Sequence, residues 1–248
     1  MKRTAAILAL MLCAAHAQAR TLYVSLTGSH DTNAPAFSTW STAATNYADA
    51  VLAAENGDTV RIAPGTYVYN RSGLLVGKAD LNIIGGRGTL FDADRTILRN
   101  QIYDRLHYST NCTISGVTFW PLSAAGFVRD AYDYRIAKSL TLDSCIIRGS
   151  SALRALILTD GAGSTARNCI IAGNANVGVL AGGADTSIHS CIYTENGGAN
   201  FEKAAFGVMP NMRNNLDSLE GIAEGSGGSY SNFSWAGVAA YIPRIGSL

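Results

Sequence analysis

The side chains best suited to chemistry in this sequence gather between residues 92 and 138. Two of them, Asp92 and Asp94, are separated by one alanine, and from a loop their carboxylates could hold one hard cation such as Ca²⁺. These two are the candidate metal ligands. The candidate catalytic residues are a pair of aspartates followed by two bases: Asp130, Asp133, Arg135 and Lys138. In this second group the aspartates would also bind the cation, and either base would contact a carboxylate of the substrate.

Both groups have a plainer interpretation. Each can be a solvated corner whose surface ion pairs contribute little to stability. The aromatic residues nearby also have two possible roles, because they can stack on sugar rings or fill a core. These aromatic residues are Tyr103, Tyr108, Phe119, Trp120, Tyr132 and Tyr134. The aspartates suggest Ca²⁺ as the one possible cofactor, and the aromatic residues suggest a polysaccharide as the possible partner.

The elements that must position these side chains repeat along the chain. One seven-residue phrase occurs three times with a cysteine in its fifth position, and an earlier copy has valine there. These residues are Val117, Cys145, Cys169 and Cys191, at steps of 28, 24 and 22 residues. Such a period is typical of a solenoid, in which each repeat buries its apolar face only against its neighbours.

The pattern inside the phrase indicates which solenoid this is. It lacks the leucines and asparagine of a leucine-rich repeat, and instead has an apolar residue, two polar residues, and then apolar-x-apolar. This predicts a strand, a two-residue corner and a second strand, with Gly116 or Asn168 at positive φ in the corner. Another apolar run follows each phrase, so three short strands per turn predict an all-β parallel β-helix. Residues 58–210 have room for about six coils.

The N-terminal residues 1–19 read as a secretory signal peptide. They contain a basic start, an apolar run and the small-x-small sequence Ala17-Gln18-Ala19, which predicts cleavage after Ala19. The apolar run is shorter than the roughly 20 residues that a membrane anchor needs. No later stretch is long enough either, so the chain is expected to be secreted, periplasmic or on the cell surface, without a transmembrane segment.

Residues 20–57 are expected to hold a strand and a capping helix. The helix is predicted from apolar residues at helical spacing, with Asn46 as its N-cap, and these residues are Tyr47, Ala50, Val51 and Ala54. It would cover the open apolar end of the β-helix. The repeat is predicted to end near Pro210, which leaves residues 211–248, rich in Asn, Gly and Ser, as an irregular tail or cap.

Composition excludes some partners. The 248 residues carry 19 Lys and Arg against 18 Asp and Glu, a net charge of +1, with no basic stripe, so no nucleic acid partner is expected. Nothing in the sequence sets an oligomeric state.

Four cysteines remain once Cys13 leaves with the signal peptide. Stacked free thiols are favoured for them, and disulfide bonds between them are the alternative. No C-x₂₋₄-C pair supports zinc.

A longer phrase carries a family resemblance. It comprises Trp40-Ser41-Thr42-Ala43-Ala44, Gly57-Asp58-Thr59-Val60 and Gly65-Thr66-Tyr67. This phrase resembles the opening of many secreted bacterial proteins with a right-handed parallel β-helix, in the pectate-lyase-like superfamily. The repeats extend the resemblance to about residue 210. It implies the handedness and the fold, but this superfamily contains lyases, hydrolases, epimerases and non-catalytic adhesins.

The family's catalytic motifs are not recognisable here. Its hydrolase signature is absent, because Arg135-Ile136-Ala137-Lys138 has an inserted alanine and lacks its companion motifs. The clustered aspartates of pectate lyases are missing as well. We therefore expect a non-catalytic, secreted or cell-surface β-helix that binds extracellular polysaccharide or a protein partner. The alternative is a polysaccharide lyase or glycoside hydrolase acting on polyuronates.

The outward residues of the repeats predict where a site would be. They are uncharged and apolar or weakly polar, namely Thr141, Ile146, Thr165, Ile170 and Ile192. The column Asp143, Arg167 and His189 is expected to face solvent, with Asp143 and Arg167 paired. Any binding is therefore expected on the loop-rich stretch 92–138.

Overall fold

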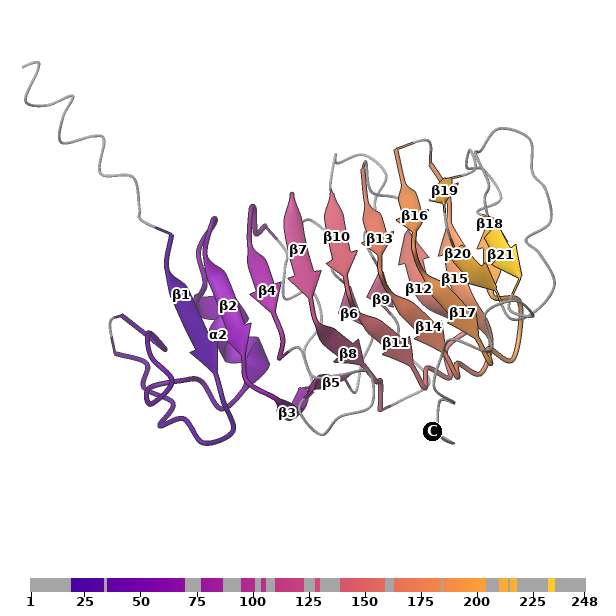
Figure 1. The fold of residues 1–248 in the computed structure, drawn as a ribbon. Coiled ribbons are helices and arrows are strands. Elements are labelled where there is room, and N and C mark those ends of the chain that lie inside the picture. Colours follow the sequence, from indigo (N-terminus) through magenta and orange to yellow (C-terminus); the bar gives the residue numbers. More distant parts are fainter. Residues whose placement is uncertain are drawn as a thin grey trace, which may run out of the picture.

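The chain winds into a parallel β-solenoid (Figure 1). The computed structural model describes residues 19–33, 35–69, 77–86, 95–100, 104–105, 110–122, 128–129, 139–158, 163–183, 185–203, 210–213, 215–217 and 232–234. Within these residues the strands form three sheets, and every pairing between named strands is parallel. The predicted all-β solenoid is therefore confirmed.

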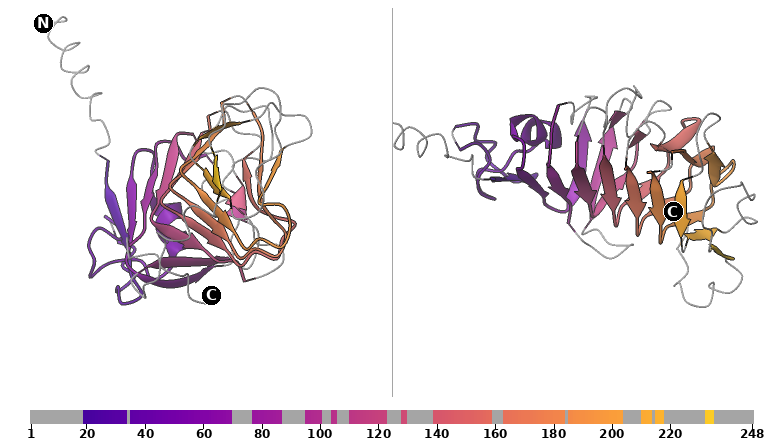
Figure 2. Two further views of the ribbon diagram at one scale, coloured as in Figure 1. Left: turned by 45° about the vertical axis from the view of Figure 1, so that its right-hand side comes forward. Right: turned by 90° about the horizontal axis from the view of Figure 1, so that it is seen from above.

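Each sheet takes one strand from successive turns, which are stacked along one axis (Figure 2). The first sheet contains, in order, β1 (Thr21–Val24), β2 (Thr59–Ile62), β4 (Asn82–Ile84), β7 (Cys112–Ser115), β10 (Leu140–Asp143), β13 (Thr165–Arg167), β16 (Ser187–His189) and β19 (Asn211–Arg213). The second contains β3 (Gly65–Tyr69), β5 (Thr96–Asn100), β8 (Val117–Phe119), β11 (Ile146–Arg148), β14 (Ile170–Ala172), β17 (Ile192–Thr194), β20 (Asn215–Asp217) and β21 (Asn232–Ser234). The third contains β6 (Asp104–Arg105), β9 (Val128–Arg129), β12 (Arg154–Leu158), β15 (Val177–Ala181) and β18 (Phe201–Lys203).

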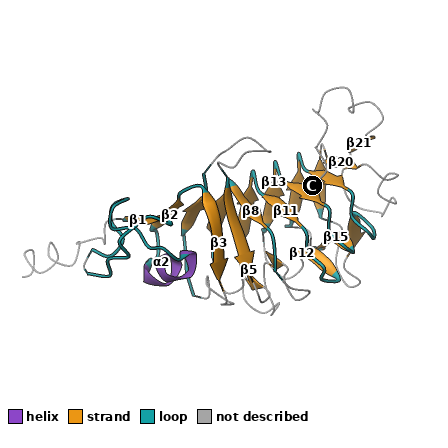
Figure 3. Cartoon of the chain, turned by 90° about the horizontal axis from the view of Figure 1, so that it is seen from below, coloured by secondary structure: helices purple, strands orange, loops and turns teal. Residues whose placement is uncertain are grey.

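About four turns, which start at β7, β10, β13 and β16, form the regular part of the solenoid. Each places one strand in each sheet. Strands β2 and β4 precede them, so the range predicted to hold about six coils, 58–210, contributes six described strands to the first sheet. These strands run side by side in Figure 1, and those of the second sheet do so in Figure 3.

The corner between the first and second sheets follows from the repeated phrase. Ser144, Asn168 and Ser190 precede the cysteines and have φ of 56°, 54° and 55°, while Gly116 has φ of 67°. A left-handed residue turns the chain sharply between two strands, and glycine and asparagine adopt it at little cost. The predicted two-residue corner is thus confirmed.

The three repeated cysteines lie in one buried column. Strand register pairs Asp143 with Arg167 and His189 on one side of the corner, and Ile146 with Ile170 and Ile192 on the other. The cysteines between them therefore stack, each at most 1% exposed, with Val117 one turn earlier. Hydrogen bonding to Cys169 and burial raise the pKa of Cys145 well above its usual value. This column is part of the core that all three sheets share.

Burial predicts that these thiols do not react in the native protein, because the reactive species is the thiolate. All four described cysteines are at most 1% exposed. Titration with an aromatic disulfide reagent should therefore detect almost no thiol in native protein and four after unfolding in denaturant. Cys13 is replaced by Ser for this titration, so that the count covers the four described cysteines. Rapid labelling of the stacked cysteines in native protein would show that the assigned strand register is wrong.

Helix α2 (Tyr47–Ala53) confirms the predicted helix. Asn46 is its N-cap, since its Oδ1 accepts a hydrogen bond from the backbone N–H of Ala48 at 2.8 Å. The helix buries Tyr47, Ala48, Ala50 and Val51 and lies against β1, β2 and β3. It sits at the N-terminal end of the solenoid (Figure 3), and no helix in the described part of the chain has the length and apolar character needed to cross a membrane.

The solenoid continues beyond Pro210. Strands β19, β20 and β21 extend the first two sheets into the range 211–248, which was predicted as an irregular tail or cap. The reason for the difference is Asn215. It takes the next place in the cysteine column, where its side chain accepts a hydrogen bond from the backbone of Cys191 at 2.9 Å and donates one to Ile188 O at 2.9 Å. An amide thus replaces the thiol that marked the repeat in the sequence.

Candidate functional site

Three residues from three neighbouring turns lie side by side on the outer face of the second sheet. Strand register aligns Leu98 with Phe119 and Phe119 with Ile147, and all three are at most 3% exposed in the core. Side chains alternate between the two faces of a strand. The residues that follow them, Arg99, Trp120 and Arg148, therefore point outward together.

Both arginines pack on the tryptophan. The guanidinium carbon of Arg99 lies 4.6 Å from the centroid of the Trp120 ring, and that of Arg148 lies 4.1 Å from it. The Arg99 Nε–H also donates to Trp120 O at 3.4 Å. Cation–π contacts of this kind hold guanidinium groups in place while their N–H donors stay free to bind other groups. Trp120 therefore serves to position two cations, and its ring is not a free platform for a sugar.

A third arginine lies close by and is almost fully buried. Arg95, the residue before β5, is 7% exposed, and its guanidinium donates to Ser144 O at 3.4 Å. Burial lowers the pKa of Arg95. Burial, and then the charges of Arg99 and Arg95, lower the pKa of Arg148. Since the charges of both Arg95 and Arg99 act on Arg148, we call these three residues the arginine cluster.

No described acidic residue forms an ion pair with the arginine cluster. The ion pairs between described residues lie elsewhere and join Arg20 to Glu55 and Asp58, His30 to Asp49, Arg154 to Glu202, and Arg167 to Asp143. Within the cluster, the buried Nε atoms of Arg95 and Arg148 have no hydrogen-bond partner among the residues that the structure describes. A guanidinium presents its donors in a fork that matches the oxygens of carboxylate or sulfate. The cluster is therefore suited to a bound anion.

A hollow of about 140 Å³ opens beside this cluster, and we call it the Trp120 hollow. It is lined by Trp120, Arg148, Gly149, Ala172 and Gly173. The hollow exists because the outward column changes from Arg148 to the small Ala172 one turn later. Gly149, at φ 65°, is needed here, since a Cβ on it would lie 2.5 Å from Nε1 of Trp120.

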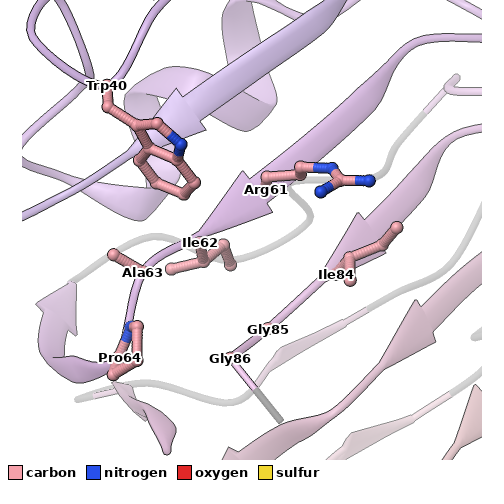
Figure 4. Close-up of a pocket in the computed structure, with 8 residues that line it drawn as sticks. All are labelled: Trp40, Arg61, Ile62, Ala63, Pro64, Ile84, Gly85 and Gly86. Atoms are coloured by element: carbon pink, nitrogen blue, oxygen red, sulfur yellow. The ribbon is translucent and has the colours of Figure 1, made fainter. Parts of the chain in front are cut away.

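A larger hollow of about 280 Å³ lies near the N-terminal end, and we call it the Trp40 hollow. It is lined by Trp40, Arg61, Ile62, Ala63, Pro64, Ile84, Gly85 and Gly86 (Figure 4). Trp40 is 49% exposed, and its ring centroid lies 4.5 Å from that of Tyr23. Arg61 is exposed and forms no ion pair with another described residue. This hollow thus joins an accessible aromatic ring to a cation.

The sequence-predicted site residues lie outside the described residues. This applies to all six candidates, Asp92, Asp94, Asp130, Asp133, Arg135 and Lys138, and to the aromatic residues Tyr103, Tyr108, Tyr132 and Tyr134. Phe119 belongs to the core. In the described part of the chain, no group of three or more His, Cys, Asp or Glu could hold a metal ion. The site therefore has to be argued from the arginine cluster and the two hollows.

The repeats were expected to have a nearly uncharged outer face. This is wrong for the second sheet, because Arg148 lies on its outer face. The outward position three residues after each Val or Cys of the column reads Trp120, Arg148, Ala172, Thr194. Aligning the repeats at this position would have revealed the change from large to small side chains. On the first sheet the predicted pair is confirmed, with Arg167 and Asp143 3.0 Å apart.

A scan against protein-family models found no match, and neither did searches of curated proteins and of solved structures. The function is therefore argued from the geometry of the site.

Proposed function

We propose that this protein is a secreted or cell-surface right-handed β-helix of the pectate-lyase-like kind that binds an acidic polysaccharide without cleaving it. The observation that supports this proposal is the arginine cluster, in which two guanidinium groups are held against Trp120 and no described acid pairs with them. Bringing like charges together is unfavourable unless an anion compensates them.

The chemistry of the cluster selects the class of ligand. Carboxylates of uronic acids or sulfate esters offer the paired oxygens that guanidinium groups bind. A polymer carries such groups at regular intervals, and an extended chain fits the outer surface of a stack of parallel strands. The Trp40 hollow supplies a complementary subsite, because the exposed ring of Trp40 can stack on a sugar and Arg61 can bind its acidic group.

Binding without cleavage is favoured by what lines the two hollows. Among the described residues, those that line them include no carboxylate and no histidine. Hydrolysis of a glycosidic bond generally uses a pair of carboxylates, and proton abstraction needs a positioned base. An arginine that stays protonated at neutral pH binds charge well but is a poor base.

Calorimetry with oligogalacturonate tests the proposal. Wild-type protein should bind it and should not bind a neutral galactan oligomer. The double substitution Arg99→Gln/Arg148→Gln should weaken binding by about 100-fold or more, since charged hydrogen bonds contribute about 1.5–3 kcal/mol each. Trp40→Leu should weaken it less, by about fivefold, because stacking contributes about 1 kcal/mol.

The matched control is Arg213→Gln, which removes an exposed arginine on the outer face of the first sheet. It should leave affinity within about twofold, because Arg213 lies on a different sheet from the arginine cluster and at the opposite end of the first sheet from Arg61. Binding that survives the double substitution would exclude the cluster, and failure of wild type to bind any polyuronate or sulfated glycan would exclude the proposed function. Release of unsaturated uronate products, with or without Ca²⁺, would instead support the lyase alternative.

A further inference from the structure

The backbone nitrogen of Arg20 lies against a buried carboxylate. It donates a hydrogen bond to Oδ1 of Asp58 at 2.8 Å, and Asp58 is 2% exposed. The other oxygen, Oδ2, accepts from the Arg20 guanidinium at 2.9 Å and 3.2 Å and from the Glu55 N–H at 2.8 Å. Burial alone would raise the pKa of Asp58, but the hydrogen bonds from Glu55 and Arg20 lower it overall, so this carboxylate is charged at neutral pH.

The charges around Asp58 do not balance while Arg20 is joined to Ala19 by a peptide bond. Two acids, Asp58 and Glu55, share the single guanidinium of Arg20, at 2.9 Å and 3.4 Å. The nearby Lys78 is occupied elsewhere, since its amino group donates to the carbonyls of Leu52 and Ala54 at the end of α2. No other described cation forms an ion pair with either acid. One more positive charge near Oδ1 would make the group neutral.

We infer that the Ala19–Arg20 bond is cut during export and that the new α-ammonium group of Arg20 forms an ion pair with the buried carboxylate of Asp58. The small-x-small sequence of residues 17–19 ends at Ala19, as a signal peptidase requires, and Ala19 is exposed. The peptidase adds water across the amide bond, which gives Ala19 a carboxylate and Arg20 an amine. At neutral pH that amine takes up a proton, because an unperturbed α-amino group has a pKa of about 7.7–8.0.

The cut needs no rearrangement of the cap. The nitrogen already lies 2.8 Å from Oδ1, so an ammonium replaces an amide donor in the same place. Asp58 connects three elements, because it precedes β2, binds the residue before β1 and accepts from Glu55 just after α2. Processing thereby strengthens the junction that holds the helix on the first turn. This inference uses none of the residues of the polysaccharide site, so each can fail without the other.

Export of the full chain in a bacterial host tests the cleavage, and amine labelling of the product tests the ion pair. Intact mass and N-terminal sequencing should identify Arg20 as the first residue. Acylation of the α-amine at pH 8, read on the N-terminal peptide by mass spectrometry, should be at least about tenfold slower in native than in denatured protein. The folded α-amine should titrate above its unfolded value. Its contribution to stability is then complete below pH of about 7.7 and is lost as the pH rises through the folded pKa.

Asp58→Asn is the matched variant, since it keeps the shape and removes the charge. It should restore fast labelling of the α-amine, whereas Asp49→Asn, on an acid of α2 that faces His30, should not. If Asp58→Asn does not fold, the labelling rates of the α-amine in native and denatured wild-type protein still test the ion pair. A first residue other than Arg20, or equal labelling of the α-amine in native and denatured wild-type protein, would overturn the inference.

Discussion

Deletion of residues 41–56 is expected to convert the protein into oligomers or aggregate. These residues protect the first turn in two ways. Helix α2 covers its apolar end with four buried side chains. In addition, Ala44 pairs with the free edge of β1, because its N–H donates to Tyr23 O at 2.9 Å and its carbonyl accepts from Ser25 N–H at 2.8 Å. Without them, an unpaired strand edge and an apolar surface become available to other chains.

Size-exclusion chromatography with light scattering measures this result directly. Val51→Asp, which places a charge at a fully buried position of the helix, is a milder form of the change and should lower stability by several kcal/mol. Leu52→Ser is the matched control, since Leu52 is next in the chain and 46% exposed; it should behave as wild type. A deletion variant with the mass and the melting temperature of wild type would contradict the role of this segment as a cap.

The sequence predicted the fold well where side-chain type determines position. Cys145, Cys169 and Cys191 mark one buried column because a small apolar residue is needed at the same point of each turn. Looking for a small apolar residue at this point of each turn failed at Asn215, because hydrogen bonds to Cys191 and Ile188 allow an amide to fill this position. A pattern defined by polarity cannot identify a polar residue that is buried and fully bonded.

The candidate site was harder to predict for a different reason. Arg99, Trp120 and Arg148 are far apart in the sequence, and only strand register brings them side by side. The reasoning from sequence looked for acids and bases close together along the chain, which is suited to a loop and not to a solenoid. In a solenoid, neighbours are about one period apart, so sites are found by comparing the same position in successive repeats.

A second buried column shows how that comparison reveals stabilising residues as well. Five residues after the three cysteines stand Ser150, Asn174 and Asn196, all at most 5% exposed. Asn174 Oδ1 accepts from Ser150 N–H at 3.0 Å, and its amide donates to Asn196 Oδ1 at 2.8 Å. This column links the corners of successive turns between the second and third sheets, and hydrogen bonds in such a chain strengthen one another.

Asn196→Ala is expected to destabilise the protein by about 4 kcal/mol, because it removes four hydrogen bonds from a buried site at about 1 kcal/mol each. Asn196 Oδ1 accepts from Asn174 at its backbone and its side chain, at 3.2 Å and 2.8 Å. Its amide donates to Ile171 O at 3.1 Å and to Asn200 Oδ1 at 2.8 Å. With Asn196 itself 5% exposed, water cannot readily replace these partners.

Urea unfolding followed by circular dichroism should show this loss as a lower midpoint. Asn176→Ala is the matched control, because Asn176 also donates to backbone carbonyls, at 3.1 Å to Ala152 O and 3.5 Å to Ser151 O, but is partly exposed. Water can take over its bonds, so that variant should lose about 1 kcal/mol or less. Equal losses in the two variants would mean that Asn196 contributes through its own corner alone, and the column would then have no special part in holding successive turns together.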